Sequence, residues 1–320
     1  MRIVLTGASG FVGQALLQAL ESEHEVTACV RNLTSALRAF DKRSSMVLAR
    51  MEPDQDWREI LTGQQLVVHC AARVHMLNDR VTDAHADYQR INVEGTLNLA
   101  RQAAQAGVKR FIFLSSIKVN GEYSEPGHPL AADDLPAPQD AYGRSKLEAE
   151  QQLLALAQQT GLEVVIIRPV LIYGAGVKAN LHRLMQWVYR GIPLPFASIE
   201  NQRSLLAMDN LVDLVQVCLS HPAAANQIFL ASDGRDVSTP ELVQYMAQAL
   251  NRPARLWSMP VFVFKAMAWS LGRQALAQRL CGSLQVDISK TCSLLNWRPR
   301  PMPHHTWQCM AQTFLESSNA

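Results

Sequence analysis

Hydrophobic residues in the first half of the chain follow two alternating periods. Short apolar runs predict buried strands at six places, Arg2–Thr6, Glu25–Val30, Met46–Ala49, Leu66–Cys70, Arg110–Ser115 and Val164–Arg168. Between these runs, apolar residues spaced three and four positions apart predict helices at Val12–Leu20, Asp83–Ala106 and Ala141–Thr160. The two longer helices each end at a glycine, Gly107 or Gly161, and glycine favours helix C-termini.

This alternation of strands and helices decides the fold class. Parallel strands need crossover helices, and strands that are apolar on both faces need helices on both sides of their sheet. We therefore predict an α/β fold built on a doubly wound parallel sheet. The alternation weakens after Pro169, so we expect residues 1–170 to form the sheet domain and residues 171–320 to form a smaller, partly interleaved domain.

The second half of the chain is less regular. Its pattern predicts three helices and one strand, Leu181–Arg190, Asn210–Leu219, Thr239–Leu250 and the strand Gln227–Ala231. We expect segments near 205–232 to return to the main sheet. The apolar stretch Met259–Gly272 is interrupted by Lys265 and falls short of the roughly 20 residues that cross a bilayer, so we interpret it as a buried helix.

Composition and charge exclude several classes of protein. The 320 residues are 48% apolar and 18% charged, which is enough apolar material for a substantial core. The net charge of +2, from 30 basic and 28 acidic residues, argues against a nucleic-acid partner. The six cysteines are scattered without a Cys-x-x-Cys pair, which argues against a metal site and fits a reducing compartment. With no secretory signal before the first strand, we expect a cytoplasmic protein without a membrane span.

The first strand leads into a glycine-rich turn. Gly7, Gly10 and Gly13 recur at every third position between this strand and the first helix. Glycine lets backbone N–H groups approach a pyrophosphate closely, and a helix N-terminus favours negative charge. The arrangement indicates a Rossmann-type dinucleotide site, with Phe11 and Val12 as further cofactor contacts.

The end of the second strand bears on which dinucleotide binds. NAD sites normally place a carboxylate there to bind the ribose 2′-hydroxyl. In this chain Val30 is followed by Arg31 and Asn32, and the Arg31 guanidinium suits a 2′-phosphate. We therefore expect NADP(H), with NAD(H) as the alternative.

Two further motifs indicate proton-transfer chemistry. Tyr142 and Lys146 are four positions apart and so share one face of a predicted helix. The pKa of a free tyrosine is about 10, and a nearby ammonium favours the phenolate. Ser115 and Ser116 end the preceding strand, where side chains point into the ligand crevice. We expect Tyr142 to exchange a proton with a substrate oxygen beside a serine hydroxyl, while Lys146 binds the nicotinamide ribose.

Together these motifs resemble the extended short-chain dehydrogenase/reductase family of nucleotide-sugar epimerases, dehydratases and reductases. Other matching segments lie along the whole chain, Val68–Ala72, Asn92–Thr96, Phe113–Gly121, Arg168–Pro169, Tyr173–Gly176 and Leu294–Pro299. The catalytic residues that the resemblance implies are Ser116, Tyr142 and Lys146. Beyond the glycine turn and Arg31, the implied cofactor contacts are Ala71, Ala72, Ser115, Tyr142, Lys146 and Pro169. The implied contacts to a sugar-nucleotide substrate are Ser116, Lys118, Asn180, Arg203 and Arg279.

Three segments resemble a bacterial subgroup encoded with O-antigen genes, Ser115–Glu122, Gly174–Asn180 and Asn201–Asn210. That subgroup reduces UDP-4-keto-6-deoxy-N-acetylglucosamine. Ile117 and Lys118 stand where the family's dehydratases carry an acidic pair, so dehydration lacks its acid and base. The resemblance therefore implies NADPH-dependent reduction of the C4 ketone of a UDP-linked 6-deoxy sugar, for O-antigen and lipopolysaccharide biosynthesis.

Two other functions stay open at this point. A UDP-hexose or UDP-N-acetylhexosamine 4-epimerase with tightly bound NAD would use the same serine, tyrosine and lysine, although Arg31 argues against it. A non-catalytic NADPH-sensing protein would be expected to have lost those residues, and they are intact. The resemblance also implies a homodimer. Lys118 either contacts the sugar or serves as an ion-pair partner.

Overall fold

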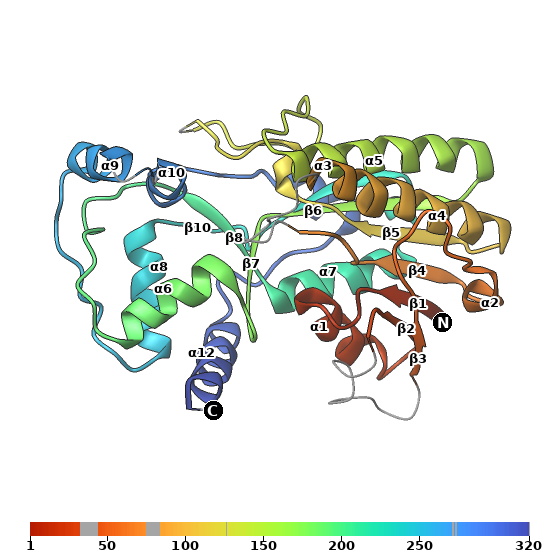
Figure 1. Cartoon of the computed structure of the whole chain (residues 1–320), viewed down its shortest axis with the longest axis horizontal. Helices are drawn as coiled ribbons and strands as arrows, with labels where there is room; N and C mark the ends of the chain where they lie inside the picture. The colour runs from red at the N-terminus through yellow and green to blue at the C-terminus, as the bar shows by residue number, and fades with distance from the viewer. Residues whose placement is uncertain (33–43, 75–83, 126, 271, 273, 320) are drawn as a thin grey trace.

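The computed structural model describes residues 1–32, 44–74, 84–125, 127–270, 272 and 274–319. Its centre is a seven-stranded sheet with the order β3-β2-β1-β4-β5-β6-β9 (Figure 1). Each neighbouring pair in this sheet is parallel. The strands are β1 Arg2–Thr6, β2 Glu25–Val30, β3 Ser45–Leu48, β4 Leu66–His69, β5 Arg110–Leu114, β6 Glu163–Pro169 and β9 Gln227–Ala231. This confirms the predicted doubly wound, Rossmann-type α/β fold.

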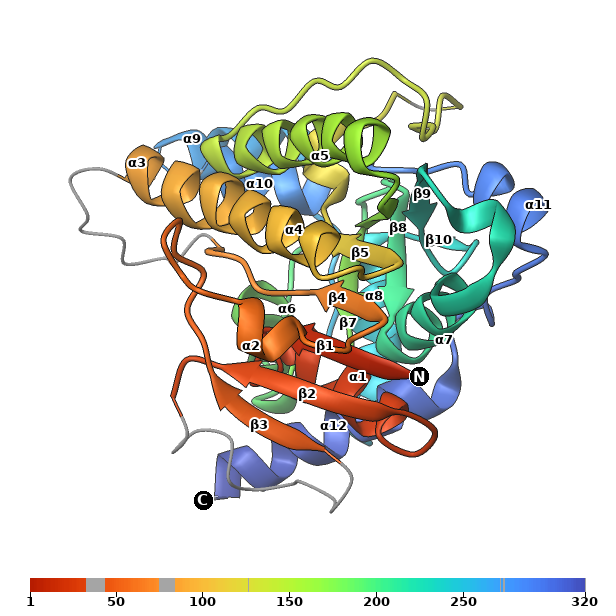
Figure 2. The same cartoon turned by 90° about the vertical axis from the view of Figure 1, so that its right-hand side faces the viewer.

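Helices cover both faces of this sheet (Figure 1 and Figure 2). One face packs against α1 (Phe11–Leu20) and α7 (Met208–Ser220). The other face packs against α2 (Arg58–Leu61), α4 (Thr96–Gln105) and α5 (Ala141–Thr160). In β5, Ile112 belongs to the first core, whereas Phe111 and Phe113 belong to the second. Alternate side chains thus enter two different cores, which explains why the strands read as continuous apolar runs.

The long helix expected at Asp83–Ala106 is divided into three parts. Asp83 lies outside the described residues, and the rest forms α3 (Ala84–Tyr88), a π-helical segment η1 (Gln89–Gly95) and α4. A Cβ on Gly95 would lie 2.6 Å from the backbone oxygen of Met51, so the chain passes there at a distance that only glycine allows. Apolar periodicity does not reveal such a π-helical turn.

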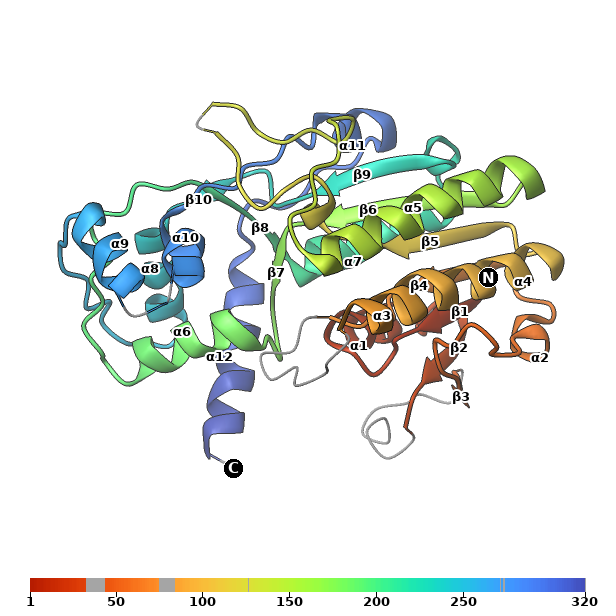
Figure 3. The ribbon, with the colours of Figure 1, turned by 45° about the horizontal axis from the view of Figure 1, so that its top comes forward.

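A second, three-stranded sheet lies beside the first, with the order β10-β8-β7 (Figure 3). Its strands are β7 Leu171–Tyr173, β8 Arg203–Ala207 and β10 Asp236–Val237. It shares a core with α6 (Ala179–Tyr189), α8 (Thr239–Ala249) and α12 (His304–Asn319). Between β8 and β10 the chain returns to the main sheet as α7 and β9, so the two cores are interleaved along the sequence. The division at residue 170 stays a prediction.

The remaining helices are η2 (Ile117–Val119), η3 (Pro222–Ala224), α9 (Val261–Ser270), α10 (Gln274–Cys281) and α11 (Ser289–Leu295). The apolar stretch around 259–272 does form a helix, α9, but its predicted burial is wrong. Phe262 is 74% exposed and Trp269 is 70% exposed. An apolar helix is usually buried, and the sequence alone does not show which faces find a partner. Within the described residues, every helix is too short or too polar to span a membrane.

Candidate active site

The glycine turn joins β1 to α1 in the conformation that the motif predicts. Gly7 adopts a left-handed φ of +71°, and Gly10 donates its backbone N–H to the Gly7 oxygen at 2.8 Å. A Cβ at Gly13 would lie 2.0 Å from that same oxygen, so α1 packs against the turn only because this residue is glycine. Gly10 is the N-cap of α1, and it has no side chain to occupy the first N–H groups of the helix. These donors suit a phosphate.

The segment that follows β4 approaches this turn closely. A Cβ at Gly7 would lie 2.7 Å from the backbone nitrogen of Ala71, and Ala71 and Ala72 are both partly exposed. This places the two predicted alanine contacts at the same edge of the sheet as the glycine turn, because β1 and β4 are parallel neighbours. Phe11 and Val12 are half-buried at the start of α1.

His69 is a buried residue of this region that the sequence analysis missed. Its Nδ1 lies 2.6 Å from Thr6 Oγ1, and its Nε2 lies 2.9 Å from Thr96 Oγ1. Burial, together with the positive charge of Lys146, lowers the pKa of His69 to about 3, so the imidazole is neutral. It joins β1, β4 and α4 beneath the glycine turn. The sequence analysis included His69 in the matching segment Val68–Ala72 but assigned it no role.

Arg31 directly follows β2, and its side chain is exposed. Residues 33–43, which follow Asn32, lie outside the described part of the chain. The structure therefore places Arg31 at the sheet edge where the adenosine ribose of a dinucleotide binds in folds of this type. Its role as a reader of a 2′-phosphate stays a prediction.

Tyr142 and Lys146 lie in the first turns of α5. The Asp140 carboxylate caps this helix by accepting the Gly143 N–H at 2.7 Å. The Tyr142 ring meets the edge of the Tyr88 ring, with the ring centres 6.2 Å apart. Burial raises the pKa of Tyr142 above its usual value, and the negative charge of Asp140 raises it further. The phenol therefore holds its proton at neutral pH.

Lys146 is 2% exposed. Its ammonium donates to the Leu114 backbone oxygen at 2.9 Å and lies 4.3 Å from the centre of the Phe113 ring. Burial lowers the pKa of Lys146 to about 8, although Cys70 and Glu150 counteract this by favouring the charged form. The ammonium is thus held at the end of β5 by one carbonyl and one aromatic face.

The two serines at the end of β5 have different environments. Ser116 is half-buried, and its hydroxyl accepts the Lys118 N–H at 3.2 Å as the N-cap of η2. Ser115 is buried, and its hydroxyl donates to the Glu150 carboxylate. The hydroxyl of Ser116 is therefore the more available of the two for a substrate oxygen, while a cofactor contact from Ser115 stays a prediction.

Glu150 and Arg168 form a buried ion pair beneath these serines. Arg168 Nη2 lies 2.5 Å from Glu150 Oε2, and both side chains are almost fully buried. Arg168 also donates to Asn120 Oδ1 at 2.9 Å. The pair ties β6 to α5, and Pro169, the predicted cofactor contact, is the last residue of β6. The ion pair gives the Arg168-Pro169 motif a structural explanation, because Arg168 holds the carboxyl end of β6 in place.

Lys118 is paired with two carboxylates. Its ammonium donates to Glu122 Oε1 at 2.9 Å and to Asp140. Burial alone would lower the pKa of Lys118, but the hydrogen bonds that its ammonium donates to Asp140 and Glu122 outweigh burial and raise the pKa. Of the two roles left open by the sequence, the ion-pair partner is the one that these contacts favour. Lys118 ties η2 to the start of α5.

Asn92 is the second buried residue to which the sequence analysis assigned no role. It lies in η1, and its Nδ2 donates to the Arg73 oxygen and to Ser145 Oγ, both at 3.1 Å. Its Oδ1 accepts the Arg73 N–H at 2.8 Å. Asn92 therefore connects the segment after β4 with the helix that carries Tyr142. The sequence analysis identified the segment Asn92–Thr96 as a family match. It did not predict the π-helical segment η1, in which the Asn92 side chain is buried.

The predicted substrate residues lie on the second sheet and its helices. Arg203 begins β8, and its Nη1 donates to the backbone oxygens of Arg279 at 3.1 Å and Gly282 at 3.0 Å. Burial lowers the pKa of Arg203 and the positive charge of Arg279 lowers it further, whereas the Glu122 carboxylate counteracts this. Two adjacent cations that repel suit an anionic ligand. Asn180 is exposed in the first turn of α6.

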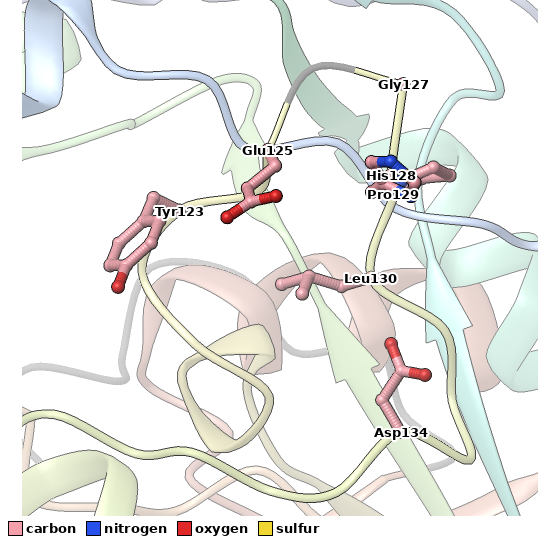
Figure 4. Close-up of a pocket in the computed structure, with 7 residues that line it drawn as sticks. All are labelled: Tyr123, Glu125, Gly127, His128, Pro129, Leu130 and Asp134. Atoms are coloured by element: carbon pink, nitrogen blue, oxygen red, sulfur yellow. The ribbon is translucent and has the colours of Figure 1, made fainter.

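A pocket of about 490 Å³ lies within the loop between η2 and α5 (Figure 4). Tyr123 and Glu125 line one arm of the loop, and His128, Leu130 and Asp134 line the other. None of these residues belongs to the predicted site. The backbone of this loop is fixed to the C-terminal part of the chain, because Ser124 donates its N–H to the Ser283 oxygen at 3.0 Å.

Comparison with known proteins identifies the family. The sequence pattern of the NAD dependent epimerase/dehydratase family matches residues 3–231. A UDP-glucose 4-epimerase of Vibrio cholerae is 45% identical over 99% of this chain and 96% of its own. Two solved structures share the fold. UDP-glucuronic acid 4-epimerase of Bacillus cereus in complex with NAD has a TM-score of 0.79 at 20% identity, covering 99% of both chains. UDP-glucose 4-epimerase of Thermotoga maritima with UDP-glucose has a TM-score of 0.78 at 19% identity, covering 99% of this chain and 100% of that chain.

These findings correct the prediction of function. The NADPH-dependent 4-keto reductase is contradicted, because a relative that matches the whole chain at 45% identity is a 4-epimerase. The preference for NADP(H) gains no support, and the O-antigen assignment stays a prediction, as does the homodimer. The error has a chemical cause: reduction at C4 and epimerisation at C4 use the same serine, tyrosine and lysine. What the motifs did identify correctly is the family, and the chain belongs to the NAD dependent epimerase/dehydratase family.

Proposed function

We infer that this protein is a UDP-sugar 4-epimerase that retains NAD through the reaction. The observation that carries this proposal is the 45% identity, over essentially the whole chain, with a UDP-glucose 4-epimerase. The arrangement of Ser116, Tyr142 and Lys146 at the carboxyl edge of the sheet supports it, because epimerisation at C4 needs only one proton-transfer group beside a hydride carrier.

The residues around the glycine turn fit a dinucleotide. The diphosphate would bind the N–H groups at the start of α1, where Gly10 leaves the donors available. Close backbone approaches at Gly7 and Gly13 leave no room for a Cβ, as expected for a turn shaped around a ligand. Ala71 and Ala72 would contact the dinucleotide through backbone atoms, and Lys146 would contact its ribose. When bound, NAD supplies the acceptor and donor of the C4 hydride and, in its oxidised form, a positive charge that favours the Tyr142 phenolate.

Tyr142 would move the proton of the sugar C4 hydroxyl. As a phenolate, Tyr142 would take this proton as C4 is oxidised, and as the resulting phenol it would return the proton as C4 is reduced on the opposite face. The pKa of Tyr142 is raised by burial and by Asp140. The phenolate therefore needs additional positive charge nearby, and Lys146, one helical turn along α5, provides part of it.

Ser116 would hold the C4 oxygen beside Tyr142. Its hydroxyl is fixed at the end of β5 by the Lys118 N–H, and this contact leaves the hydroxyl proton available for donation. Epimerisation also requires that the sugar ring turn over between the two hydride transfers. A single serine contact at C4 allows such a rotation, whereas a rigid set of sugar contacts would prevent it.

Arg203 and Arg279 would hold the UDP diphosphate while the sugar turns. Arg203 is fixed by two backbone oxygens, and the charge of Arg279 lies close to it. Binding energy from the nucleotide would thus keep the substrate in place without restricting the hexose. Asn180, in the first turn of α6, is proposed as a further contact to the nucleotide. In this proposal residues 1–170 bind NAD and residues 171–320 bind the sugar nucleotide.

The test is an assay without added cofactor. Purified protein is incubated with UDP-glucose, and the products are separated by chromatography and identified by NMR. The proposal predicts UDP-galactose, together with NAD released from the denatured protein in about a one-to-one ratio, the stoichiometry of a retained cofactor. UDP-N-acetylglucosamine in a parallel reaction tests whether the site also accepts the N-acetyl group.

A matched pair of variants ties the activity to the proposed residue. Tyr142→Phe removes the proposed proton carrier and should abolish turnover while the protein still contains NAD. Tyr123→Phe makes the same change at an exposed tyrosine and should leave turnover unaltered. Full activity of Tyr142→Phe, or oxidation of NADPH by a 4-keto sugar without any epimerisation, would contradict the proposal.

A further inference from the structure

Lys118 contacts both halves of the proposed proton-transfer pair. Its backbone N–H donates to Ser116 Oγ at 3.2 Å, and its ammonium donates to Asp140, the N-cap of α5. Asp140 in turn accepts the N–H of Gly143 at 2.7 Å, and Gly143 directly follows Tyr142. One residue therefore connects the serine at the end of β5 with the helical turn that carries the tyrosine.

The backbone of η2 packs directly against this turn. A Cβ at Gly143 would lie 2.8 Å from the backbone oxygen of Lys118 and 3.2 Å from Asp140 Oδ1. Both this contact and the bond to Ser116 belong to the backbone of residue 118, so a change of its side chain leaves their donor and acceptor atoms in place. Replacing Lys118 by methionine removes the ammonium and keeps most of the apolar stem.

The charges around the ammonium do not balance. Lys118 Nζ lies 2.9 Å from Glu122 Oε1 and also contacts Asp140, so one cation meets two carboxylates. The two carboxylates act on different neighbours. The charge of Asp140 favours the protonated form of Tyr142, whereas the charge of Glu122 favours the protonated form of Arg203. Asp140 is therefore the carboxylate of this cluster that opposes a phenolate.

Other polar groups around the phenol come from the elements that pack against the start of α5. Lys146 on α5 favours the phenolate, and Tyr88 on α3 presents its ring to Tyr142 at 6.2 Å. Behind these two residues lie groups that act on them, namely Cys70 and Glu150 beside Lys146, and the Arg73–Asp87 ion pair beside Tyr88. Arg144 on α5 is exposed. Among these groups, the Asp140 carboxylate is the one that the Lys118 ammonium contacts directly.

We propose that Lys118 is a positioning residue for Tyr142, because its ammonium holds Asp140 in an ion pair and offsets the carboxylate charge that opposes the phenolate. This inference rests on the proposed role of Tyr142 in proton transfer. A phenolate must form before the proton of the C4 hydroxyl can be taken, and an ammonium held on the nearby carboxylate makes that form more stable. The ion pair thus sets the pH at which turnover begins.

The first test is the pH dependence of kcat with UDP-glucose. Lys118→Met leaves Asp140 without its counter-charge and should move the midpoint of the rising limb up by about one pH unit, which lowers turnover below the midpoint about tenfold. Asp140→Asn removes the opposing charge and should move the midpoint down, while asparagine still caps α5. The double variant lacks both charges and should have a midpoint near that of the wild type.

Two control variants separate charge from structure. Lys118→Arg keeps the positive charge and should restore the wild-type midpoint. Lys290→Met removes a lysine from another ion pair, in which Lys290 and Asp133 lie 2.7 Å apart and the aspartate is well exposed, and it should leave the midpoint unchanged. A variant that merely weakened the structure would lower turnover at every pH without moving the midpoint. Circular dichroism and thermal unfolding establish that each variant is folded.

The second test does not depend on turnover. The tyrosinate absorbance of the purified protein is titrated with base, and the same titration of Tyr142→Phe is subtracted to isolate the phenolate of Tyr142. The Lys118→Met and Asp140→Asn substitutions should move this titration up and down in pH, as they move kcat. If UDP-glucose is not epimerised at all, the proposed function fails, while this titration still tests the role of Lys118.

Three results would overturn the proposal. The first is a Tyr142 titration with the same midpoint in the wild type, Lys118→Met and Asp140→Asn. The second is a shift of the two single variants in the same direction, because opposite charges must act oppositely on the phenol. The third is a double variant that keeps the full upward shift of Lys118→Met, since Asp140 would then not be the charge that the ammonium offsets.

Discussion

The buried pair of Glu150 and Arg168 allows a quantitative prediction. Arg168 contacts Glu150 through Nε at 3.0 Å and through Nη2 at 2.5 Å, and Ser115 donates to the same carboxylate. Changing Glu150→Gln keeps the shape of the side chain but removes its charge and places an amide N–H₂ against the arginine donors. Arg168 then remains as a buried cation without a counter-charge.

The magnitude follows from this burial. Removing one partner of a fully buried ion pair typically costs about 3–5 kcal/mol of unfolding free energy. For a chain of this size, roughly 2 °C of melting temperature is lost per kcal/mol, so we expect a fall of roughly 6–10 °C. An exposed pair serves as the control. Lys290 and Asp133 lie 2.7 Å apart, but the aspartate is 76% exposed, so Asp133→Asn should cost about 0–1 kcal/mol.

The assay is a double-mutant cycle by chemical and thermal unfolding. Glu150→Met and Arg168→Met are measured singly, Glu150→Met/Arg168→Met is measured as the double variant, and Glu150→Gln is measured beside them. Removing both charges leaves no uncompensated ion, so the double variant should lose less stability than the two single variants together. Additive losses, or a cost for Glu150→Gln no larger than that of Asp133→Asn, would refute the reasoning.

Three further predictions concern the candidate site. Lys146→Met should change how the stability of cofactor-free protein depends on pH. The pKa of Lys146 is about 8 in the folded protein, whereas its ordinary value, which applies to the unfolded chain, is 10.5. Between pH 8 and 10.5 the unfolded chain therefore binds more protons than the folded protein. Wild-type stability should therefore rise by up to about 3 kcal/mol from pH 8 to 10.5, and the variant should lack this rise in urea unfolding. Arg203→Ala and Arg279→Ala should each raise the KM for UDP-glucose about tenfold with a smaller change in kcat, since a charge-assisted hydrogen bond to phosphate is worth about 1.5–3 kcal/mol. Gly13→Ala should abolish NAD retention, measured as dinucleotide released on denaturation, because its Cβ would lie 2.0 Å from a backbone oxygen of the turn.

Each of these predictions has a clear contrary result. A stability difference between wild type and Lys146→Met that is the same at every pH would show that the lysine has an ordinary pKa. Unchanged steady-state constants in both arginine variants would place the diphosphate elsewhere. Normal NAD content in Gly13→Ala would mean that the glycine turn does not hold the cofactor.

The sequence was sufficient for the main sheet because its strands are apolar on both faces. The ranges of β1, β2, β9 and α5 agree with the prediction to the residue, and the left-handed Gly161 ends α5 as expected. The π-helical turn at Asn92 was out of reach, because a single extra residue in a helical turn leaves the apolar period almost unchanged. The burial of α9 was misjudged because the period of a helix does not reveal what it packs against.

The sequence predicted those parts of the candidate site whose geometry is set by short, local segments of the chain. Ser116 caps the short helix η2, and Tyr142 and Lys146 lie within the first two turns of α5, so short motifs describe their backbone positions well. The contact between Arg203 and Arg279 joins residues that are 76 positions apart, and it needed the structure. The choice between reductase and epimerase depends on whether NAD is exchanged or retained, and the motifs shared by the two reactions do not encode it.

The most direct test of the central claim follows hydrogen at the sugar C4. UDP-glucose is epimerised in D₂O, and the C4 position of the product is examined by proton NMR. The account predicts that C4 keeps its protium, because only the hydroxyl proton handled by Tyr142 exchanges with solvent. Deuterium at C4 of the epimerised product would contradict hydride transfer with a retained cofactor, and with it the proposed function.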